Sequence, residues 1–407
     1  MSRPRLVSKP FVAVTAATGA FFIYVGMLVP LLPTFIEDEL GAGELGVGLS
    51  VSAFAFAAIF ARPIIGRLVE RFGRRRVMIG GSLLAGLAGF LCATVNSLPP
   101  LLALRGIAGI GEAAVFVAAA TLVADLASPE RRAEAASYFS VAVFGGIGIG
   151  PVIGEAVLQD DRFHLAFLVA SSFTVLAAVM SLAVPHHVLA PFDDADLEPV
   201  PTYRGFHKFV HPAALGPGLV LASGIAAFSV FSAFLPEYAR SIGFAGSGGL
   251  FAAYSIVCLL LRLAGARLPE RLGARRAVTI AFVTLATALG ALATFPAAWA
   301  LWASAIIIGV GMAFMYPSLM ALTINRVDDR ERPVVIGSFT MFFEVGTMFG
   351  GIVLGTVAQL FGKRASFGAA VLLCAFGLWL LRSRVAPAEA TTVERARRPV
   401  YVPVAAD

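Results

Sequence analysis

Long apolar runs separated by short polar breaks dominate this sequence of 407 residues. A helix needs about 20 apolar residues to cross a bilayer, and twelve runs are of that order. They lie near residues 11–35, 46–66, 77–96, 99–123, 136–158, 164–185, 213–236, 247–266, 277–295, 297–323, 334–360 and 365–382. Only 14% of the residues are charged, against about 25% in soluble domains. A water-soluble enzyme is therefore excluded, and the sequence predicts an all-α polytopic membrane protein with twelve transmembrane helices.

The positions of lysine and arginine predict how these spans are oriented. If the amino terminus is cytoplasmic, 24 of the 31 Lys and Arg residues fall in cytoplasmic segments and 4 in outer loops. The remaining three, Arg62, Arg105 and Arg262, lie within spans. An excess of positive charge marks the cytoplasmic side of membrane proteins. We therefore expect a multi-pass protein of the cytoplasmic (inner) membrane with both termini cytoplasmic.

The two halves of the chain repeat at a fixed offset of 200 residues. Segments 62–76 and 262–276 share eight identities without a gap. Six spans per unit is an even number, so both units face the same way, as in two-bundle secondary transporters. We therefore expect two parallel six-helix bundles. The expected boundaries are an N-terminal bundle at 1–185, a cytoplasmic linker at 186–212, a C-terminal bundle at 213–382 and a cytoplasmic tail at 383–407.

The segment after the second span carries the most specific motif. It contains Gly66, Glu70, Arg71, Gly73 and Arg74, and it resembles the signature loop of the major facilitator superfamily, G-x-L-x-D-R-x-G-R-R/K. The resemblance implies the fold of that family and a latch on the cytoplasmic side, formed by the acid and the arginines. A glutamate stands here where the family has aspartate. The alternative is a loop that only fixes topology, but such a loop would not need glycines at fixed spacing.

A second element after the fourth span resembles the D-x-x-P-x-x-R element of the same family. It contains Asp125 and Arg132. By resemblance, Asp125 is expected to join Arg71 in the cytoplasmic gate.

The fourth span contains the residues expected to couple transport to protons. Arg105, Gly109, Gly111 and Glu112 match the R-x-x-x-G-x-G pattern of proton-coupled members of the family. Arg105 and Glu112 are seven residues apart and therefore lie on one helix face. We expect Glu112 to carry the proton and Arg105 to stabilise its ionised form, with a structural ion pair as the alternative. Glu344 is the second deep acid, and it is either a proton site or a buried hydrogen-bonded acid.

The fifth span contains Gly146, Gly150, Pro151, Gly154 and Glu155. This run resembles the antiporter motif G-x-x-x-G-P-x-x-G-G, which is associated with exporters in the superfamily. Proline removes a backbone hydrogen bond, and glycines allow close helix contact. Glu155 stands where the motif has its last glycine. It is expected either to be a solvated acid or to form an outer entry point for protons.

Four aromatic residues are candidates for substrate contact, because helices 1, 4, 7 and 10 line the cavity in this family. They are Tyr24, Phe228, Phe231 and Tyr316, and simple packing is the alternative for each. The spans hold no nucleophile–base pair, no His/Asp cluster and no phosphate loop. We therefore predict no catalytic residue, no cofactor and no metal site.

Together these features favour the drug:proton antiporter branch of the family. Such a carrier exports a small, amphiphilic molecule by alternating access in exchange for protons. An importer or uniporter of a sugar or other small metabolite with the same fold is the alternative, and a membrane-embedded enzyme or receptor is least favoured. The expected partners are a small-molecule substrate, protons and the lipid bilayer. No nucleic acid is expected, and the protein is expected to be a monomer.

Overall fold

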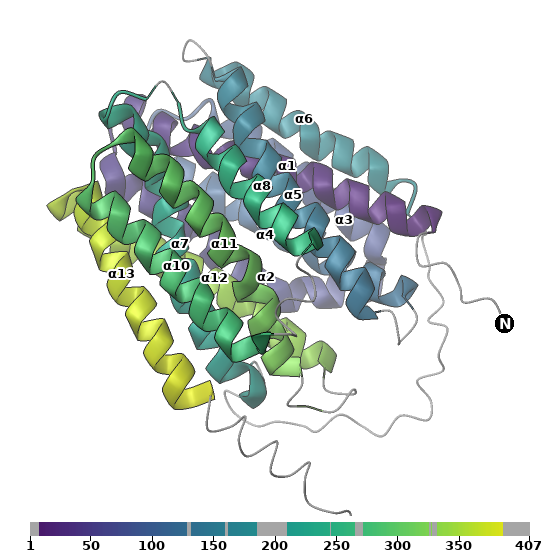
Figure 1. Cartoon of the computed structure of the whole chain (residues 1–407). Coiled ribbons are helices and arrows are strands. Elements are labelled where there is room, and N and C mark those ends of the chain that lie inside the picture. Colours follow the sequence, from purple (N-terminus) through teal and green to yellow (C-terminus); the bar gives the residue numbers. More distant parts are fainter. Residues whose placement is uncertain are drawn as a thin grey trace, which may run out of the picture.

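The computed structural model describes residues 8–127, 132–158, 162–184, 210–244, 246–264, 272–324, 327 and 332–385. The first half of this part forms α1 (Lys9–Asp38), α2 (Gly43–Phe72), α3 (Arg74–Cys92), α4 (Leu98–Leu126), α5 (Arg132–Val157) and α6 (Phe163–Ser181). The second half forms α7 (Pro212–Ser241), α8 (Gly248–Ala264), α10 (Ala274–Thr294), α11 (Ala298–Ile324), α12 (Arg332–Phe361) and α13 (Lys363–Leu380), followed by a short π-helix, η5 (Leu381–Val385) (Figure 1).

These helices confirm the predicted fold class. Each of the twelve expected spans coincides with a helix, and the described residues contain no strand. Eleven of the described helices are long and apolar enough to cross a membrane, and the shorter apolar segment Gly248–Arg262 lies in α8. Most of the predicted linker and tail lies outside the described residues.

Glycines and a serine define several helix ends. The Ser8 hydroxyl caps α1 by accepting the Phe11 N–H at 3.4 Å. Gly73, between α2 and α3, has a φ of 83°, and its repeat counterpart Gly273 has a φ of 80°. Side chains other than glycine rarely adopt this backbone conformation. Residues 66–72, expected to form a loop, are instead the last two turns of α2, and the chain turns only at Gly73.

Two pairs of helices make the most extensive contacts between the halves. The helix α2 packs along α12, and α5 packs along α8. The repeat relates these two interfaces, because α8 corresponds to α2 and α12 corresponds to α5. The approach of α2 and α12 is close, since a Cβ at Gly48 would collide with the Gly351 carbonyl oxygen. The Ser52 hydroxyl also donates to the Met348 carbonyl oxygen at 2.8 Å across this interface.

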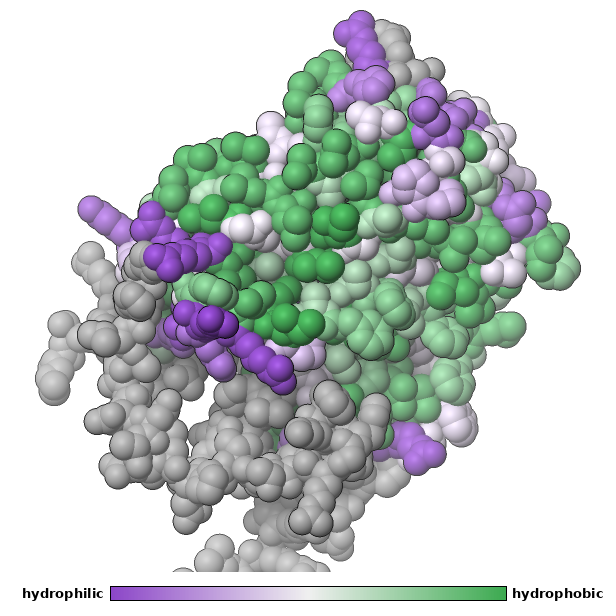
Figure 2. All heavy atoms as spheres, turned by 180° about the vertical axis from the view of Figure 1, so that it is seen from behind, coloured by the Kyte–Doolittle hydropathy of each residue, from purple (hydrophilic) through white to green (hydrophobic). Residues whose placement is uncertain are grey.

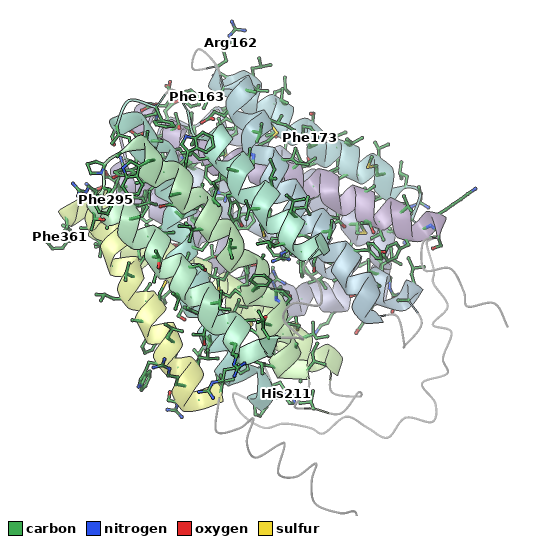
Figure 3. The ribbon with its side chains drawn as sticks, viewed as in Figure 1. Arg162, Phe163, Phe173, His211, Phe295 and Phe361 are labelled. Atoms are coloured by element: carbon green, nitrogen blue, oxygen red, sulfur yellow. The ribbon has the colours of Figure 1, made fainter. Side chains whose placement is uncertain are left out.

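The bundle has two polar ends and an apolar flank. We call the end where α1 begins and η5 stops the termini face, and the other end the opposite face. Figure 3 places His211 at the termini face and Arg162, Phe163, Phe295 and Phe361 at the opposite face. Hydrophobic residues cover most of the coloured surface between the ends (Figure 2). Large apolar side chains such as Phe60 and Leu372 are exposed on the helices, as expected for a protein that faces lipid.

Candidate transport site

A charged cluster lies deep in the bundle where α2, α4 and α12 meet. The guanidinium Nη2 of Arg62 on α2 is 2.7 Å from Glu344 Oε1 on α12 and 3.8 Å from Glu112 Oε2 on α4. The three side chains are only 12%, 8% and 6% exposed, in that order. We call these three residues the central triad. It brings Glu112 and Glu344, the two acids predicted from the sequence, together around one cation.

The charge balance of the central triad is uneven. One guanidinium faces two carboxyl groups, so the triad carries a net charge of −1 when both acids are ionised. Glu112 Oε2 has no hydrogen-bond partner among the described residues, although it is buried. Uncompensated charge in a low-dielectric interior is costly. The arrangement is therefore chemically suited to bind one proton or to receive another positive charge.

Aromatic rings surround this cluster. The Arg62 guanidinium carbon lies 5.1 Å from the centroid of the Phe116 ring. Tyr316 on α11 packs between Phe144 and Phe339, with ring centroids 6.4 and 5.7 Å away. Phe144 belongs to α5, so its contact with Tyr316 also crosses between the halves. The charged groups therefore lie beside an aromatic environment at the contact of the two halves.

The repeat places a second arginine in an equivalent setting without acids. Arg262 on α8 corresponds to Arg62, while Phe144 and Met312 occupy the positions equivalent to Glu344 and Glu112. The Arg262 guanidinium carbon lies 3.7 Å from the Phe144 ring centroid, and its Nη2 donates to the Met312 carbonyl oxygen at 3.1 Å. The two halves thus share one geometry, but among the described residues acids lie beside Arg62 and not beside Arg262.

Arg105 does not pair with Glu112 as expected. Its guanidinium carbon instead lies 4.6 Å from the Phe54 ring centroid. Seven residues place two side chains on one face, but they are separated by about 10 Å along the helix axis. Arg62, which the sequence identified only as lying within a span, takes the place predicted for Arg105. The cost of burying a charge was the signal that could have drawn attention to it.

The structure describes part of the predicted cytoplasmic gate. Asp125 forms an ion pair with Arg74 at 2.6 Å. Arg71, the expected partner of Asp125, lies over the Phe72 ring at 5.2 Å. The Glu70 side chain is exposed at the end of α2, Gly66 faces open space, and the side chain of Arg132 lies outside the described part.

The glycines of the antiporter motif pack α5 against α1. A Cβ at Gly146 would meet the Gly19 carbonyl oxygen at 2.7 Å, and one at Gly150 would meet the Gly26 Cα at 2.5 Å. Gly154 faces Met27 in the same way, and Pro151 lies within α5. The motif therefore serves close helix contact inside the first half.

Glu155 forms hydrogen bonds to the second half and is therefore not the freely solvated acid that was one of its two expected roles. Its role as an outer entry point for protons stays a prediction. Its carboxylate accepts the backbone N–H groups of Ser247 and Gly248, and it accepts the Ser247 hydroxyl at 3.0 Å. These are the residues that start α8 in the other half. Glu155 therefore joins the halves at the opposite face.

The four aromatic candidates fall into two groups. The Tyr24 hydroxyl donates to the Ala85 carbonyl oxygen at 2.9 Å inside the first half, and its side chain is fully buried. Phe231 is also fully buried, packed against Phe228 and Tyr254. Both positions are explained by packing. Phe228 and Tyr316 are partly exposed, and only Tyr316 lies beside the central triad.

The chain matches known transporters over most of its length. A family model described as Major Facilitator Superfamily matches residues 14–251 and 220–404. Multidrug resistance protein 1 of Bacillus subtilis is 26% identical over 379 residues, which cover 90% of this chain and 94% of that protein. An uncharacterised MFS-type transporter of Pseudomonas aeruginosa is 27% identical over 383 residues, or 92% of each chain.

Solved transporters share the same fold. A bacterial homologue of the human lysosomal transporter Spinster, in an inward-facing and unoccupied conformation, has a TM-score of 0.78 at 15% identity and covers 98% of this chain and 100% of its own. A nucleoside transporter has a TM-score of 0.74 at 14% identity and covers 92% and 99%. These similarities are to transporters rather than to enzymes.

Proposed function

Because this chain belongs to the Major Facilitator Superfamily of membrane transporters, we propose that it exports a small amphiphilic molecule in exchange for protons. The observation that carries the proposal is the central triad, in which one arginine is shared by two buried acids from different halves. The similarity to a multidrug resistance protein supports the same assignment. The antiporter motif on α5 supports export.

The triad suggests how a proton could drive the conformational cycle. Arg62 and Glu344 form a charged contact across the α2/α12 interface. Protonation of Glu344 removes the charge that holds Arg62 to α12, and Glu112, within α4 of the same half as Arg62, remains to accept the guanidinium. A proton thereby weakens the contact between halves without leaving the arginine unpaired.

Antiport requires that substrate and proton compete. An amphiphilic cation placed beside the acids supplies the positive charge that a proton would otherwise supply, so the two exclude each other by electrostatics. Tyr316 and the Phe144 ring offer an apolar surface for the rest of such a molecule. In this proposal the termini face is cytoplasmic, the protein is a monomer, and the substrate leaves through the opposite face.

Reconstituted liposomes with an internal pH-sensitive dye test this proposal. An inside-acid gradient is imposed, and tetraphenylphosphonium, ethidium and rhodamine 6G are added in turn to wild type and to Glu112→Gln and Glu344→Gln. We expect proton movement that depends on a compound in wild type and is lost in both variants. Glu39→Gln is the matched control, because Glu39 is exposed at the end of α1.

The opposite results are equally informative. Proton movement that persists in both glutamine variants would contradict a role for the central triad. Transport of a compound with no proton movement at all would contradict antiport and favour a uniporter of the same fold.

A further inference from the structure

The contacts between the halves are unevenly distributed along the bundle. Pairs of described residues make polar contacts between the halves at the opposite face and in the middle, where Arg62 meets Glu344. Among the described residues, no such pair is found at the termini face. These polar contacts between described residues of the two halves therefore lie at the opposite face and in the middle of the bundle.

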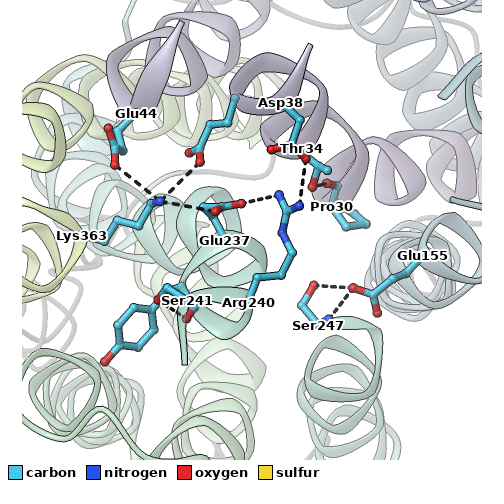
Figure 4. A network of polar contacts seen from close by, with 12 residues as sticks. Pro30, Thr34, Asp38, Glu44, Glu155, Glu237, Arg240, Ser241, Ser247 and Lys363 are labelled. Carbon is cyan, nitrogen blue, oxygen red and sulfur yellow. Dashed lines mark hydrogen bonds and ion pairs between the residues drawn. The ribbon is translucent and has the colours of Figure 1, made fainter. Parts of the chain in front are cut away.

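Two basic residues of the second half, Lys363 and Arg240, form ion pairs with the first half at the opposite face (Figure 4). Lys363 Nζ, at the start of α13, lies 3.4 Å from Glu37 Oε2 on α1, 3.5 Å from Glu44 Oε1 on α2 and 4.0 Å from Glu237 Oε1 on α7. Arg240, near the end of α7, pairs with Asp38 on α1 at 2.9 Å and with Glu237. Each base therefore connects its own half with the first half.

Glu155 provides a separate contact between the halves, on the helix pair α5 and α8. Its carboxylate, near the end of α5, accepts two backbone N–H groups at the start of α8. The first N–H groups of a helix have no partner within the helix, and the helix dipole favours a negative charge there. A Cβ at Gly246 or Gly248 would collide with this carboxylate, so the glycines leave room for it.

We propose that these contacts form a gate that holds the opposite face closed, with Lys363 and Glu155 as its two fastening points. The gate consists of Glu37, Asp38, Glu44 and Glu155 from the first half and Glu237, Arg240, Ser247 and Lys363 from the second. This inference rests on the alternating access proposed above, in which the opposite face must open once per cycle.

The properties of the gate suit a contact that must break. Lys363 is 16% exposed, whereas Arg240 and Asp38 are 33% and 40% exposed. Partly solvated ion pairs stabilise a structure weakly, because water competes for the charges. Several weak contacts at separate helix pairs can together favour the closed state and still separate without a large barrier. A dry apolar seal would not open as readily.

Distances between spin labels test this proposal. Ser97, at the start of α4, and Ser241, at the end of α7, are both exposed and lie on different halves at the opposite face. Cysteines at these two positions are labelled with nitroxides, and the distance distribution is measured by pulsed electron spin resonance. The three native cysteines are buried, and the parent protein is checked for absence of label.

The variants remove one fastening point at a time. We expect Lys363→Met and Glu155→Ala to raise the ratio of the long-distance to the short-distance population by at least about tenfold over the parent. Glu39→Gln, an exposed acid on the same face that forms no ion pair with another described residue, is expected to leave the distribution unchanged. A second label pair at Arg76 and Arg276 on the termini face is expected to shorten in the same variants.

The proposal is overturned if both gate variants remain monodisperse after purification and keep the parent distribution. Glu155→Gln is the milder variant should Glu155→Ala fail to fold, since it removes the charge and keeps one acceptor oxygen. These distances are measured without substrate and without a proton gradient. A failed antiport assay would therefore leave the gate untouched, and a failed gate would leave the proton assay of the central triad untouched.

Discussion

Arg62 Nη2 on α2 lies 2.7 Å from Glu344 Oε1 on α12, and this contact joins the two halves of the protein in the middle of the bundle. The same guanidinium group is also the counter-charge of Glu112. When one partner of an ion pair that crosses an interface is protonated, the contact between the two helices is weakened. The proposed coupling of protons to conformational change depends on this relationship.

Replacement of Arg62 by methionine is expected to destabilise the protein. The change leaves two buried acids without their shared cation, and removing one partner of a buried pair costs about 3–5 kcal/mol. Thermal denaturation of the purified protein in detergent measures the effect. The triple variant Arg62→Met/Glu112→Gln/Glu344→Gln contains no unpaired charge, so we expect it to recover more than half of the loss. Equal destabilisation of the two variants would contradict this account.

Transfer of the acid to the other interface is expected to restore coupling. Phe144 occupies the repeat position of Glu344 and contacts Arg262, the counterpart of Arg62. We expect Phe144→Glu in a Glu344→Gln background to form an ion pair across α5 and α8. Some of the proton movement lost in Glu344→Gln should then return in the liposome assay. Phe144→Gln in the same background is the control, since it cannot carry a charge.

The glycines of α5 are expected to differ sharply in their tolerance of a side chain. Gly150 meets α1 so closely that a Cβ has no space, whereas nothing lies within 4 Å of a Cβ at Gly145. Overpacking a tight contact costs about 1–3 kcal/mol, so Gly150→Ala should lower the midpoint of thermal denaturation and Gly145→Ala should not. Alanine is the better helix former, so a fall of equal size in both variants would contradict the role assigned to the α1–α5 contact.

Length and apolar content were sufficient to predict the fold class. A bilayer-spanning helix requires a long apolar run, and each of the twelve runs became a helix. Helix ends were less accurate. The α2 helix continues to Phe72, well beyond the apolar run that ends near residue 66, because the polar residues of the motif continue the helix until the left-handed backbone at Gly73.

The site could be predicted only in part. The sequence singled out Glu112 and Glu344 as deep acids and Arg105 as a costly deep arginine, whereas Arg62 was noted only as lying within a span. The partner of each charge could not be predicted, because it depends on which helices pack together. Arg62 and Glu344 are 282 residues apart in sequence. The residues on one face of a helix do not identify the helix that packs against that face. The sequence identified Glu155 as a departure from the motif. Its contact with α8 could not be predicted, because it depends on how the two halves pack together.

Proton release on substrate binding tests the central claim most directly. Purified wild type in weakly buffered detergent solution is mixed with tetraphenylphosphonium, or with another dye that drives proton movement in liposomes, and a pH indicator records the protons released. Competition at the central triad predicts release from wild type that disappears in both Glu112→Gln and Glu344→Gln while Glu39→Gln behaves as wild type. Binding without release in wild type, or release that is unchanged in both triad variants, would contradict it.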